Sequence, residues 1–228
     1  MSITPDLIAR TGLRLLNDVG LDGLTMRLLA KELGVQAPTL YWHVKNKQEL
    51  LDLMAGLITA EAADGIEGPG RNETWQQWIA GLARRMRGTM LRYRDGARVT
   101  AGSYSTGLSI GRTFELVLRT LTDAGFSAAE AARAFPAVLH YVMGFTIEQQ
   151  ARTGEDYEGP NPYARTMDID EARHPLTASV AAELRAVDSD DNFEYGLQIV
   201  LAGMASVRQE AGTERPVAAT SRRSSSPS

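Results

Sequence analysis

Apolar residues recur at the three- and four-residue spacing of helices along most of the chain, whereas alternating stretches rich in Val, Ile and Thr are missing. This pattern predicts an all-α protein. The first helix has a complete set of boundary signals, because Thr4 can act as its N-cap and Pro5 can take its first position. We expect this helix to stop at Gly20.

Three more helices are predicted before residue 64. Thr25 can cap a helix of about eight residues that ends at Gly34, and a still shorter helix begins at Pro38. Asn46 and Glu49 resemble a capping box that opens a fourth helix. The apolar stripe of this fourth helix consists of Leu50, Leu51, Met54 and Ile58.

Breaks in the periodicity divide the rest of the chain. Gly, Pro and charged residues over 64–72 precede a long helix that starts near Trp75, and the segment "RYRDGARVTAG" then interrupts the pattern. A Ser127–Glu130 capping box opens a later helix, and a long acidic loop is expected at 153–177. The later helices are expected over residues 108–124, 127–152, 178–187 and 191–209.

These breaks predict four parts. They are a helix-turn-helix domain at 1–46, a connecting helix at 47–63, a second helical domain at 64–210, and a tail at 211–228 that is too polar to pack and is expected to be disordered.

Composition and charge narrow the class of protein. The 228 residues are 43% hydrophobic, which supports a sizeable core, and the net charge of −4 at pH 7 excludes a protein coated in basic residues. Any contact with nucleic acid must therefore come from a local patch. The absence of cysteine excludes disulfides and thiolate sites, and no apolar run reaches the roughly 18 residues of a membrane span. We expect a cytoplasmic protein with no membrane segment.

Residues 25–47 have the dimensions of a helix-turn-helix, in which two short helices cross at a turn containing Gly34. The second helix carries side chains with polar tips at Thr39, Tyr41, Trp42 and His43. Lys45 and Lys47 follow and could reach phosphates. Aromatic residues at helical spacing are more often core, however, so spacing alone leaves DNA binding and an aromatic corner of the core about equally open.

Longer segments resemble a known family. The segment "LTMRLLAKELGVQAPTLYWHVKNKQELLDLM" is similar to the DNA-binding part of the TetR (tetracycline repressor) family of transcriptional regulators. The segments "RYRDGARV" and "FEYGLQIVLAGM" resemble later parts of the tetracycline-repressor branch, so the resemblance reaches from the N-terminus to about residue 207. It implies a repressor that binds double-stranded operator DNA as a homodimer and is released by a small-molecule effector.

The resemblance also implies which residues contact DNA. They are Thr25, Arg27, Pro38, Thr39, Tyr41, Trp42, His43 and Lys47. Ala37 stands where this branch commonly has a glutamine that reads a base, and an alanine methyl group cannot make a bidentate contact with adenine. The resemblance therefore predicts DNA binding but leaves the operator sequence open.

A pocket in the second domain is implied in the same way. Its expected lining is Leu82, Met86, Thr100, Tyr104, Phe114, Val117, Phe135, His140 and Glu148. Thr100 stands where the branch has a histidine that helps to bind the magnesium carried by tetracycline, and Leu82 replaces a polar amide. We therefore expect an apolar, aromatic or polycyclic effector, with no bound metal or cofactor. His140 and Glu148 could equally be a core histidine and an exposed glutamate.

Dimerisation is implied for helices 127–152 and 191–209, which resemble the four-helix bundle of the family. A two-fold dimer reads two half-sites, whereas a single short recognition helix reads few base pairs. The interface candidates are Phe193, Tyr195, Leu197, Val200 and Met204. An ordinary intrachain core would also account for some of these apolar residues.

Two other functions compete with this interpretation. An enzyme is conceivable because His174 lies near Asp168, Asp170 and Glu171, but no His-x-x-x-His, paired-glutamate or Gly-rich phosphate pattern accompanies them. We expect no enzymatic activity. The closer alternative is a DNA-binding regulator, either repressor or activator, that has no small-molecule effector.

Overall fold

The computed structural model describes residues 3–103, 108–153, 169–186 and 189–213. Within these ranges every regular element is a helix, which confirms the predicted all-α fold. The helices are α1 (Pro5–Gly23), α2 (Met26–Glu32), α3 (Ala37–Tyr41), α4 (Lys47–Ala63), α5 (Trp75–Leu91), α6 (Gly96–Ala101), α7 (Leu108–Asp123), α8 (Ala128–Thr153), α9 (Pro175–Ser179), α10 (Ala181–Arg185) and α11 (Asp190–Thr213). Across the described ranges, none of them is long and apolar enough to cross a membrane. Most of the predicted acidic loop and tail lies outside the described residues.

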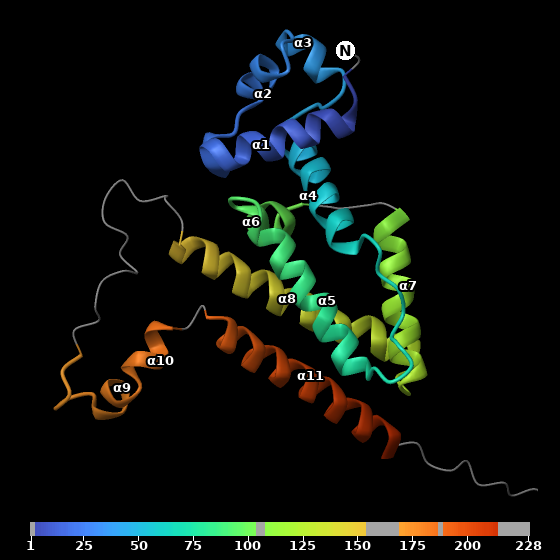
Figure 1. Cartoon of the computed structure of the whole chain (residues 1–228), viewed down its shortest axis with the longest axis vertical. Coiled ribbons are helices and arrows are strands. Elements are labelled where there is room, and N and C mark those ends of the chain that lie inside the picture. Colours follow the sequence, from blue (N-terminus) through green and yellow to red (C-terminus); the bar gives the residue numbers. More distant parts are fainter. Residues whose placement is uncertain (1–2, 104–107, 154–168, 187–188, 214–228) are drawn as a thin grey trace, which may run out of the picture.

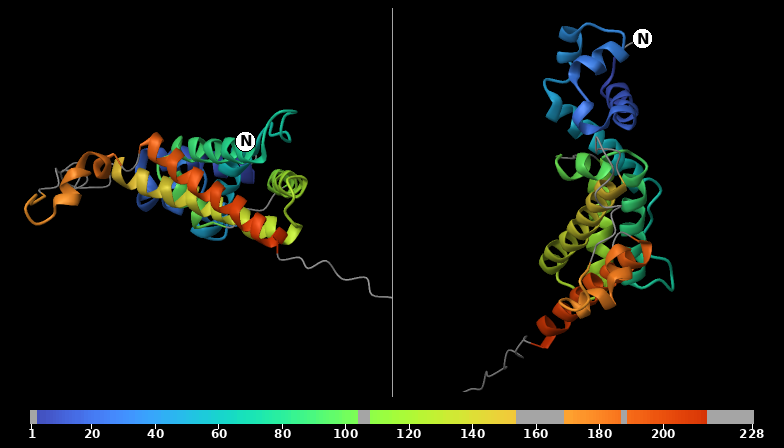
Figure 2. Two further views of the ribbon diagram at one scale, coloured as in Figure 1. Left: turned by 90° about the horizontal axis from the view of Figure 1, so that it is seen from below. Right: turned by 90° about the vertical axis from the view of Figure 1, so that its left-hand side faces the viewer.

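The helices form a small N-terminal lobe and a larger body (Figure 1). The lobe consists of α1, α2 and α3, and α4 runs from it into the body, which is built from α5 to α8 and α11. The right-hand view of Figure 2 shows the same elongated shape with the lobe at one end. The short helices α9 and α10 lie beside the body rather than on it.

The predicted boundary signals set the ends of the first two helices. Thr4 Oγ1 accepts a hydrogen bond from the backbone N–H of Leu7, and Thr25 Oγ1 accepts one from that of Leu28, each at 3.2 Å. Gly20 interrupts the regular part of α1 with a φ of 68°, a left-handed conformation that favours glycine. The predicted stop at Gly20 is therefore a sharp kink, after which one more turn follows.

The two predicted capping boxes differ in detail. Asn46 Oδ1 accepts from the backbone N–H of Glu49 at 2.9 Å, but the Glu49 carboxylate accepts from Lys45 N–H at 2.6 Å instead of from Asn46. Ser127 and Glu130 form the complete reciprocal pair, at 3.2 and 2.7 Å. At both helix starts, the side-chain acceptors satisfy backbone N–H groups that have no hydrogen-bond partner within the helix.

The expected interruption after α5 was wrong in part, because α6 forms inside it. Asp95 has a left-handed φ of 56° and reverses the chain, and a Cβ at Gly96 would clash with the Met90 carbonyl oxygen. The fully buried residues of α6 are Ala97 and Val99. This helix is thus held by tertiary packing rather than by its own length. The single helix expected over 178–187 is likewise two shorter ones, α9 and α10, which meet at Val180.

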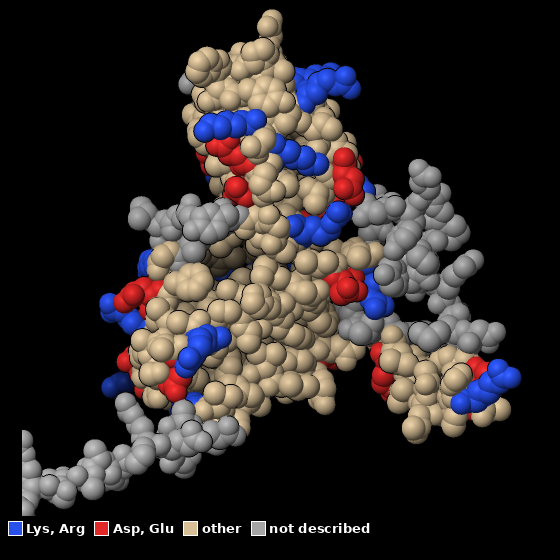
Figure 3. Space-filling model, turned by 180° about the vertical axis from the view of Figure 1, so that it is seen from behind, with Lys and Arg blue, Asp and Glu red and all other residues tan. Residues whose placement is uncertain are grey.

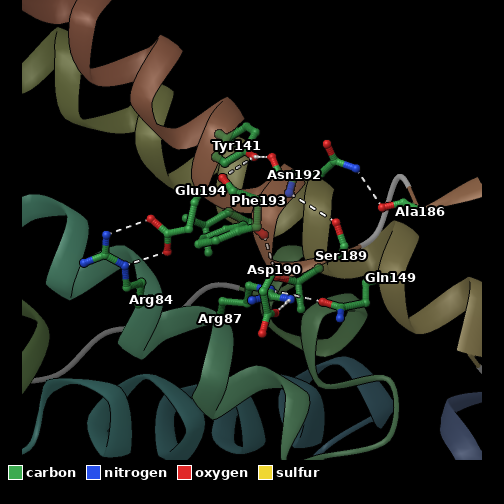
Figure 4. Close-up of polar contacts among 12 residues, drawn as sticks. Arg84, Arg87, Tyr141, Gln149, Ala186, Ser189, Asp190, Asn192, Phe193 and Glu194 are labelled. Carbon is green, nitrogen blue, oxygen red and sulfur yellow. Dashed lines mark hydrogen bonds and ion pairs between the residues drawn. The ribbon is translucent and has the colours of Figure 1, made fainter. Parts of the chain in front are cut away.

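Polar contacts fasten α11 to the body (Figure 4). Arg84 of α5 donates to both carboxylate oxygens of Glu194, at 2.6 and 2.7 Å. Arg87, which is almost buried, donates to Asp190 at 2.7 Å, and its guanidinium carbon lies 4.6 Å from the ring centre of Phe193. These contacts fix which side of α11 faces its own chain.

Stability should depend weakly on pH through Glu194. The hydrogen bond from Arg84 lowers the pKa of the Glu194 carboxyl, so its contribution to the free energy of unfolding is complete above the ordinary pKa of about 4.3 and is lost as the pH falls through the lower folded-state value. Because the Arg84 and Glu194 side chains are 53% and 34% exposed, the pair should contribute at most about 1 kcal/mol. Denaturant titrations should show that Glu194→Gln costs less stability at about pH 3 than at about pH 7. An equal cost at both pH values would contradict this.

Candidate nucleic-acid interface and ligand cavity

α3 is anchored by one apolar side chain and exposes the others. Leu40 is fully buried in the lobe, whereas Trp42 is 89% exposed and Tyr41 is 46% exposed. Pro38, Thr39 and His43 are exposed as well. A free indole ring contributes nothing to the core, so the structure disfavours an aromatic corner and instead presents these rings to a partner.

The surface near α3 carries cations without carboxylate partners. Arg27, Lys31 and Lys45 are exposed, and in the part of the chain that the structure describes none of them forms an ion pair. Arg14 of α1, by contrast, pairs with Glu32 at 2.5 Å. Lys and Arg atoms are visible on this upper lobe in the space-filling view (Figure 3). Such unpaired cations can replace counterions at phosphates.

Two of the predicted DNA-contacting residues also have roles inside the lobe. The Thr25 hydroxyl caps α2 as described above, although the residue is exposed. Lys47 is half-buried, and its Nζ donates to the Leu21 carbonyl oxygen at 2.7 Å. Lys47 therefore joins the start of α4 to the end of α1, and its ammonium group has two further N–H donors that a phosphate can accept from.

Gln36 is a surface residue that the sequence analysis missed. It is the N-cap of α3, it is exposed, and its side chain makes no capping hydrogen bond. A carboxamide can pair with adenine in the major groove, which the neighbouring Ala37 cannot do. The signal that could have revealed it is its place directly before the first turn of the exposed helix.

A cavity of about 190 Å³ lies in the body where α4, α5, α6, α7 and α8 meet. It is lined by Ile58, Thr59, Ala62, Ala63, Leu82, Met86, Met90, Thr100, Ser103, Thr113, Phe114, Phe135, Leu139 and Met143. This described lining contains no Asp, Glu, Lys, Arg or His. A site with this lining suits an uncharged, mainly apolar molecule.

The predicted pocket residues fall into four groups. Those that line the cavity are Leu82, Met86, Thr100, Phe114 and Phe135. Val117 is fully buried but is not among the lining residues. His140 and Glu148 are exposed on α8 and lie outside the lining, and Tyr104 lies outside the described residues. Ser103, whose buried Oγ has no hydrogen-bond partner, is a lining residue that the sequence analysis did not name.

Contacts made by α4 and α6 connect the cavity to the lobe. The cavity residues on α4 are Ile58, Thr59, Ala62 and Ala63. The other half of α4 buries Leu50 in the core beneath the lobe. At the start of α6, Asp95 accepts from the backbone N–H of Leu21 at 2.8 Å, and just after its end the Gly102 carbonyl oxygen accepts from Gln48 Nε2 of α4 at 3.0 Å. These contacts therefore connect α4 and α6 at the cavity directly to the lobe.

α11 has an inner and an outer face. Phe193 and Leu197 are fully buried against their own chain, and Met204 is nearly so. These three of the five predicted interface residues support α11 from its inner side and have little surface left to offer a partner. Tyr195 is 68% exposed, and Val200 is half-buried.

The outer face continues as an apolar stripe. Ile199 and Val207 are 57% and 61% exposed, and they follow Tyr195 at helical spacing. A groove between α8 and α11 is lined by Phe126, Glu130, Arg133, Ala134, Ala137, Ile199, Val200, Gly203, Met204, Val207 and Arg208. The surface available to a partner is therefore centred closer to Ile199 and Val207 than the interface residues predicted from the sequence.

Asp170, one of the residues considered for an enzymatic site, stabilises a turn before α9. Asp170 Oδ1 accepts from the backbone N–H groups of Ala172 and Arg173, at 3.0 and 3.2 Å, and His174 is exposed at the start of α9. Asp168 lies outside the described residues. Across the described ranges, no three His, Asp or Glu side chains lie close enough together to hold a metal ion.

Comparisons with known proteins match both halves of the chain. A family model described as bacterial regulatory proteins of the tetR family matches residues 8–54, and one described as the tetracyclin repressor-like C-terminal domain matches residues 68–208. The chain is 38% identical over 209 residues to the tetracycline repressor protein class A from transposon 1721 of Escherichia coli, which covers 90% of this chain and 92% of that protein.

Solved structures agree with these matches. A crystal structure described as a possible TetR family transcriptional regulator from Streptomyces coelicolor A3(2) is 37% identical, covers 90% of this chain and 100% of its own, and has a TM-score of 0.79. The Streptomyces coelicolor TetR family protein ActR in complex with actinorhodin is 29% identical, covers 92% of this chain and 98% of its own, and has a TM-score of 0.76.

Proposed function

This chain belongs to the tetR family of bacterial regulatory proteins, and from that premise we propose that it is a transcriptional repressor that binds a palindromic operator as a homodimer and leaves it when a small-molecule effector binds. The observation that carries the proposal is the path of α4, which joins the lobe bearing the exposed α3 to the wall of the cavity. The members of this family are transcription regulators rather than hydrolytic enzymes. The repressor acts in the cytoplasm, where the bacterial chromosome lies.

α3 is the recognition helix of this proposal. The exposed residues from Pro38 to His43, which belong to α3 and the two positions after it, enter the major groove. Arg27 approaches a base from α2, and Lys45 contacts a phosphate beside the groove. Lys47 contacts phosphate as well, through the N–H donors that the Leu21 carbonyl leaves free. Gln36 and Ala37 stand at the N-terminal end of α3, the end with which a recognition helix contacts base edges, so in this proposal they influence which operator is preferred.

Release from DNA requires that the effector favour one dimer geometry over another. In the DNA-bound form the two recognition helices must be spaced for successive major grooves, about 34 Å apart. An effector that binds better when α4 or α6 has shifted draws the population away from this spacing. By linkage, operator DNA must weaken effector binding by the same factor.

Asp95 is the residue whose loss should loosen this connection. Asp95→Ala removes the acceptor for Leu21 N–H and the partner of Arg98, which lies at 2.9 Å, so the free energy of unfolding should fall by about 1–3 kcal/mol. Asp95→Asn keeps an acceptor oxygen and tolerates the left-handed backbone, so it should cost less. Urea titrations of both variants test this. Equal losses would mean that the hydrogen bond to α1 contributes little.

The effector is an apolar, aromatic or polycyclic compound rather than magnesium–tetracycline. What supports this is the cavity lining, in which Thr100, Leu82 and Ala63 offer neither a metal ligand nor a charge. Calorimetry with tetracycline, with and without magnesium, is the test. Tight, magnesium-dependent binding would overturn this part of the proposal while leaving the repressor function intact.

The function itself is tested by footprinting on the DNA upstream of the chain's own gene, with and without a library of apolar ring compounds. We expect protection of a palindromic site that one class of compounds abolishes. Absence of any protected site would refute DNA-binding regulation. Protection that persists through the whole library would favour the alternative of a regulator without an effector, which the open cavity disfavours.

A further inference from the structure

Ser103 contributes a buried hydroxyl to a mainly apolar cavity. It follows α6 directly and lines the cavity, and its Oγ is shielded from solvent without a hydrogen-bond partner. An unsatisfied buried polar atom is costly, so most such atoms in proteins have a partner. A bound molecule is one way to supply it, because the residue lines a space large enough to hold one, and a rotation about the Cα–Cβ bond of Ser103 would turn the hydroxyl toward that space.

The other lining hydroxyls near this point are already engaged. Thr59 Oγ1 donates to the Ala55 carbonyl and Thr100 Oγ1 donates to that of Gly96, each at 2.8 Å. Thr113 also has an interaction with a neighbour. The remaining lining consists of hydrocarbon, aromatic and thioether side chains, and within the described residues it carries no formal charge.

We propose that the effector is an uncharged ring compound whose single hydrogen-bonding group, a hydroxyl or carbonyl, meets Ser103 Oγ. This inference rests on the proposed function in taking the cavity as the effector site. A charged group would lose its hydration without gaining a counter-charge, whereas one neutral polar group exchanges water for the serine hydroxyl. The ligand is thereby oriented, with its polar end at the end of α6 and its rings toward α8.

The size and walls of the cavity suit one or two fused rings. The cavity measures about 190 Å³, and an apolar cavity of about 150 Å³ in another protein is enough for benzene. Phe114 and Phe135 stand edge to face in its wall, with ring centres 5.7 Å apart. A flat aromatic ligand can extend this arrangement. Met86, Met90 and Met143 are unbranched and adjust to the outline of the rings.

Three probes of nearly equal size test separately the effect of a hydrogen-bonding group and the effect of a charge on binding. They are 2-naphthol, 2-methylnaphthalene and 2-naphthoate, which present a hydroxyl, a methyl group and a charge on the same ring system. Calorimetric titration of the full-length protein without DNA should show that 2-naphthoate binds at least about 10-fold more weakly than 2-naphthol. In Ser103→Ala, the preference for 2-naphthol over 2-methylnaphthalene should fall by about 2- to 10-fold, the value of one neutral hydrogen bond.

Control variants keep the test decisive. Ser103→Thr retains the hydroxyl and should keep the preference, and Ser179→Ala removes a hydroxyl on exposed α9 and should change nothing. Ala63→Phe fills the cavity and should weaken all three probes together. The melting temperature of Ser103→Ala should not fall, because the hydroxyl has no partner to lose.

Several results would overturn the proposal. They are an unchanged preference in Ser103→Ala, tighter binding of 2-naphthoate than of 2-naphthol, and no binding of any of the three probes. Because the titrations use no DNA, a failure of operator binding would refute the proposed function without altering these ratios. The two failures are therefore distinguishable.

Discussion

Replacing Trp42 with alanine should weaken operator binding by roughly 100- to 1,000-fold while leaving the fold intact. The side chain is 89% exposed, so its removal takes almost nothing from the core. Truncating a tryptophan at the centre of an interface typically costs about 2 kcal/mol or more, and a dimer on a two-fold operator loses the contact twice. The measurement is fluorescence anisotropy with a labelled operator at one fixed salt concentration, since the affinity depends on salt.

Leu176→Ala is the matched control for Trp42→Ala. Leu176 is 83% exposed, which is similar to Trp42, but it lies on α9 away from the lobe. We expect it to leave operator affinity within about twofold of the wild type, as for most surface substitutions. If Trp42→Ala also retained affinity within that margin, the exposed face of α3 would not be the surface that meets DNA.

Placing aspartate at both Ile199 and Val207 should separate the dimer and thereby remove operator binding at micromolar protein concentrations. Both side chains are more than half exposed on the outer face of α11. In a two-fold interface each substitution occurs twice and buries unpaired charges, each of which costs several kcal/mol. Sedimentation velocity should show a monomer, and anisotropy should show operator affinity reduced by about 100-fold or more, because a monomer reads one half-site.

Gln198→Asp provides the control for that variant. Gln198 is exposed on α11 directly beside Ile199, but it is not among the residues of the α8–α11 groove. It adds one negative charge to the same helix, where the double variant adds two, and it should leave the dimer intact. A dimer that survives both aspartates at Ile199 and Val207 would place the interface on another surface.

Local features of the fold could be predicted from the sequence because they depend on neighbouring residues. Thr25, Asn46 and Ser127 cap their helices with hydrogen bonds that span only three residues. α6 could not be predicted, since it is too short to form alone and depends on a distant hydrogen bond from Leu21 to Asp95. The helix-turn-helix could be predicted for the same reason as the caps, because its two helices are adjacent in the chain.

Residues of the candidate sites could be predicted from the sequence only where the type of residue alone indicates its role. Trp42 is conspicuous in any sequence, but its exposure depends on Leu40 turning inward. On α11, apolar residues occur on both faces, so periodicity could not tell the buried Phe193 from the exposed Tyr195. Ser103 is an ordinary serine until the surrounding helices enclose it and leave it without a partner.

The residues that line the cavity and the residues exposed on α3 have no member in common, and α4 lies between them. This separation makes the protein suitable for use as a biosensor. Substitutions at Leu82, Met86 or Phe135, which line the cavity, should change the compound that is detected while the same promoter is read. Changes at Gln36 and Ala37 can redirect an existing sensor to another promoter, so input and output can be engineered one at a time.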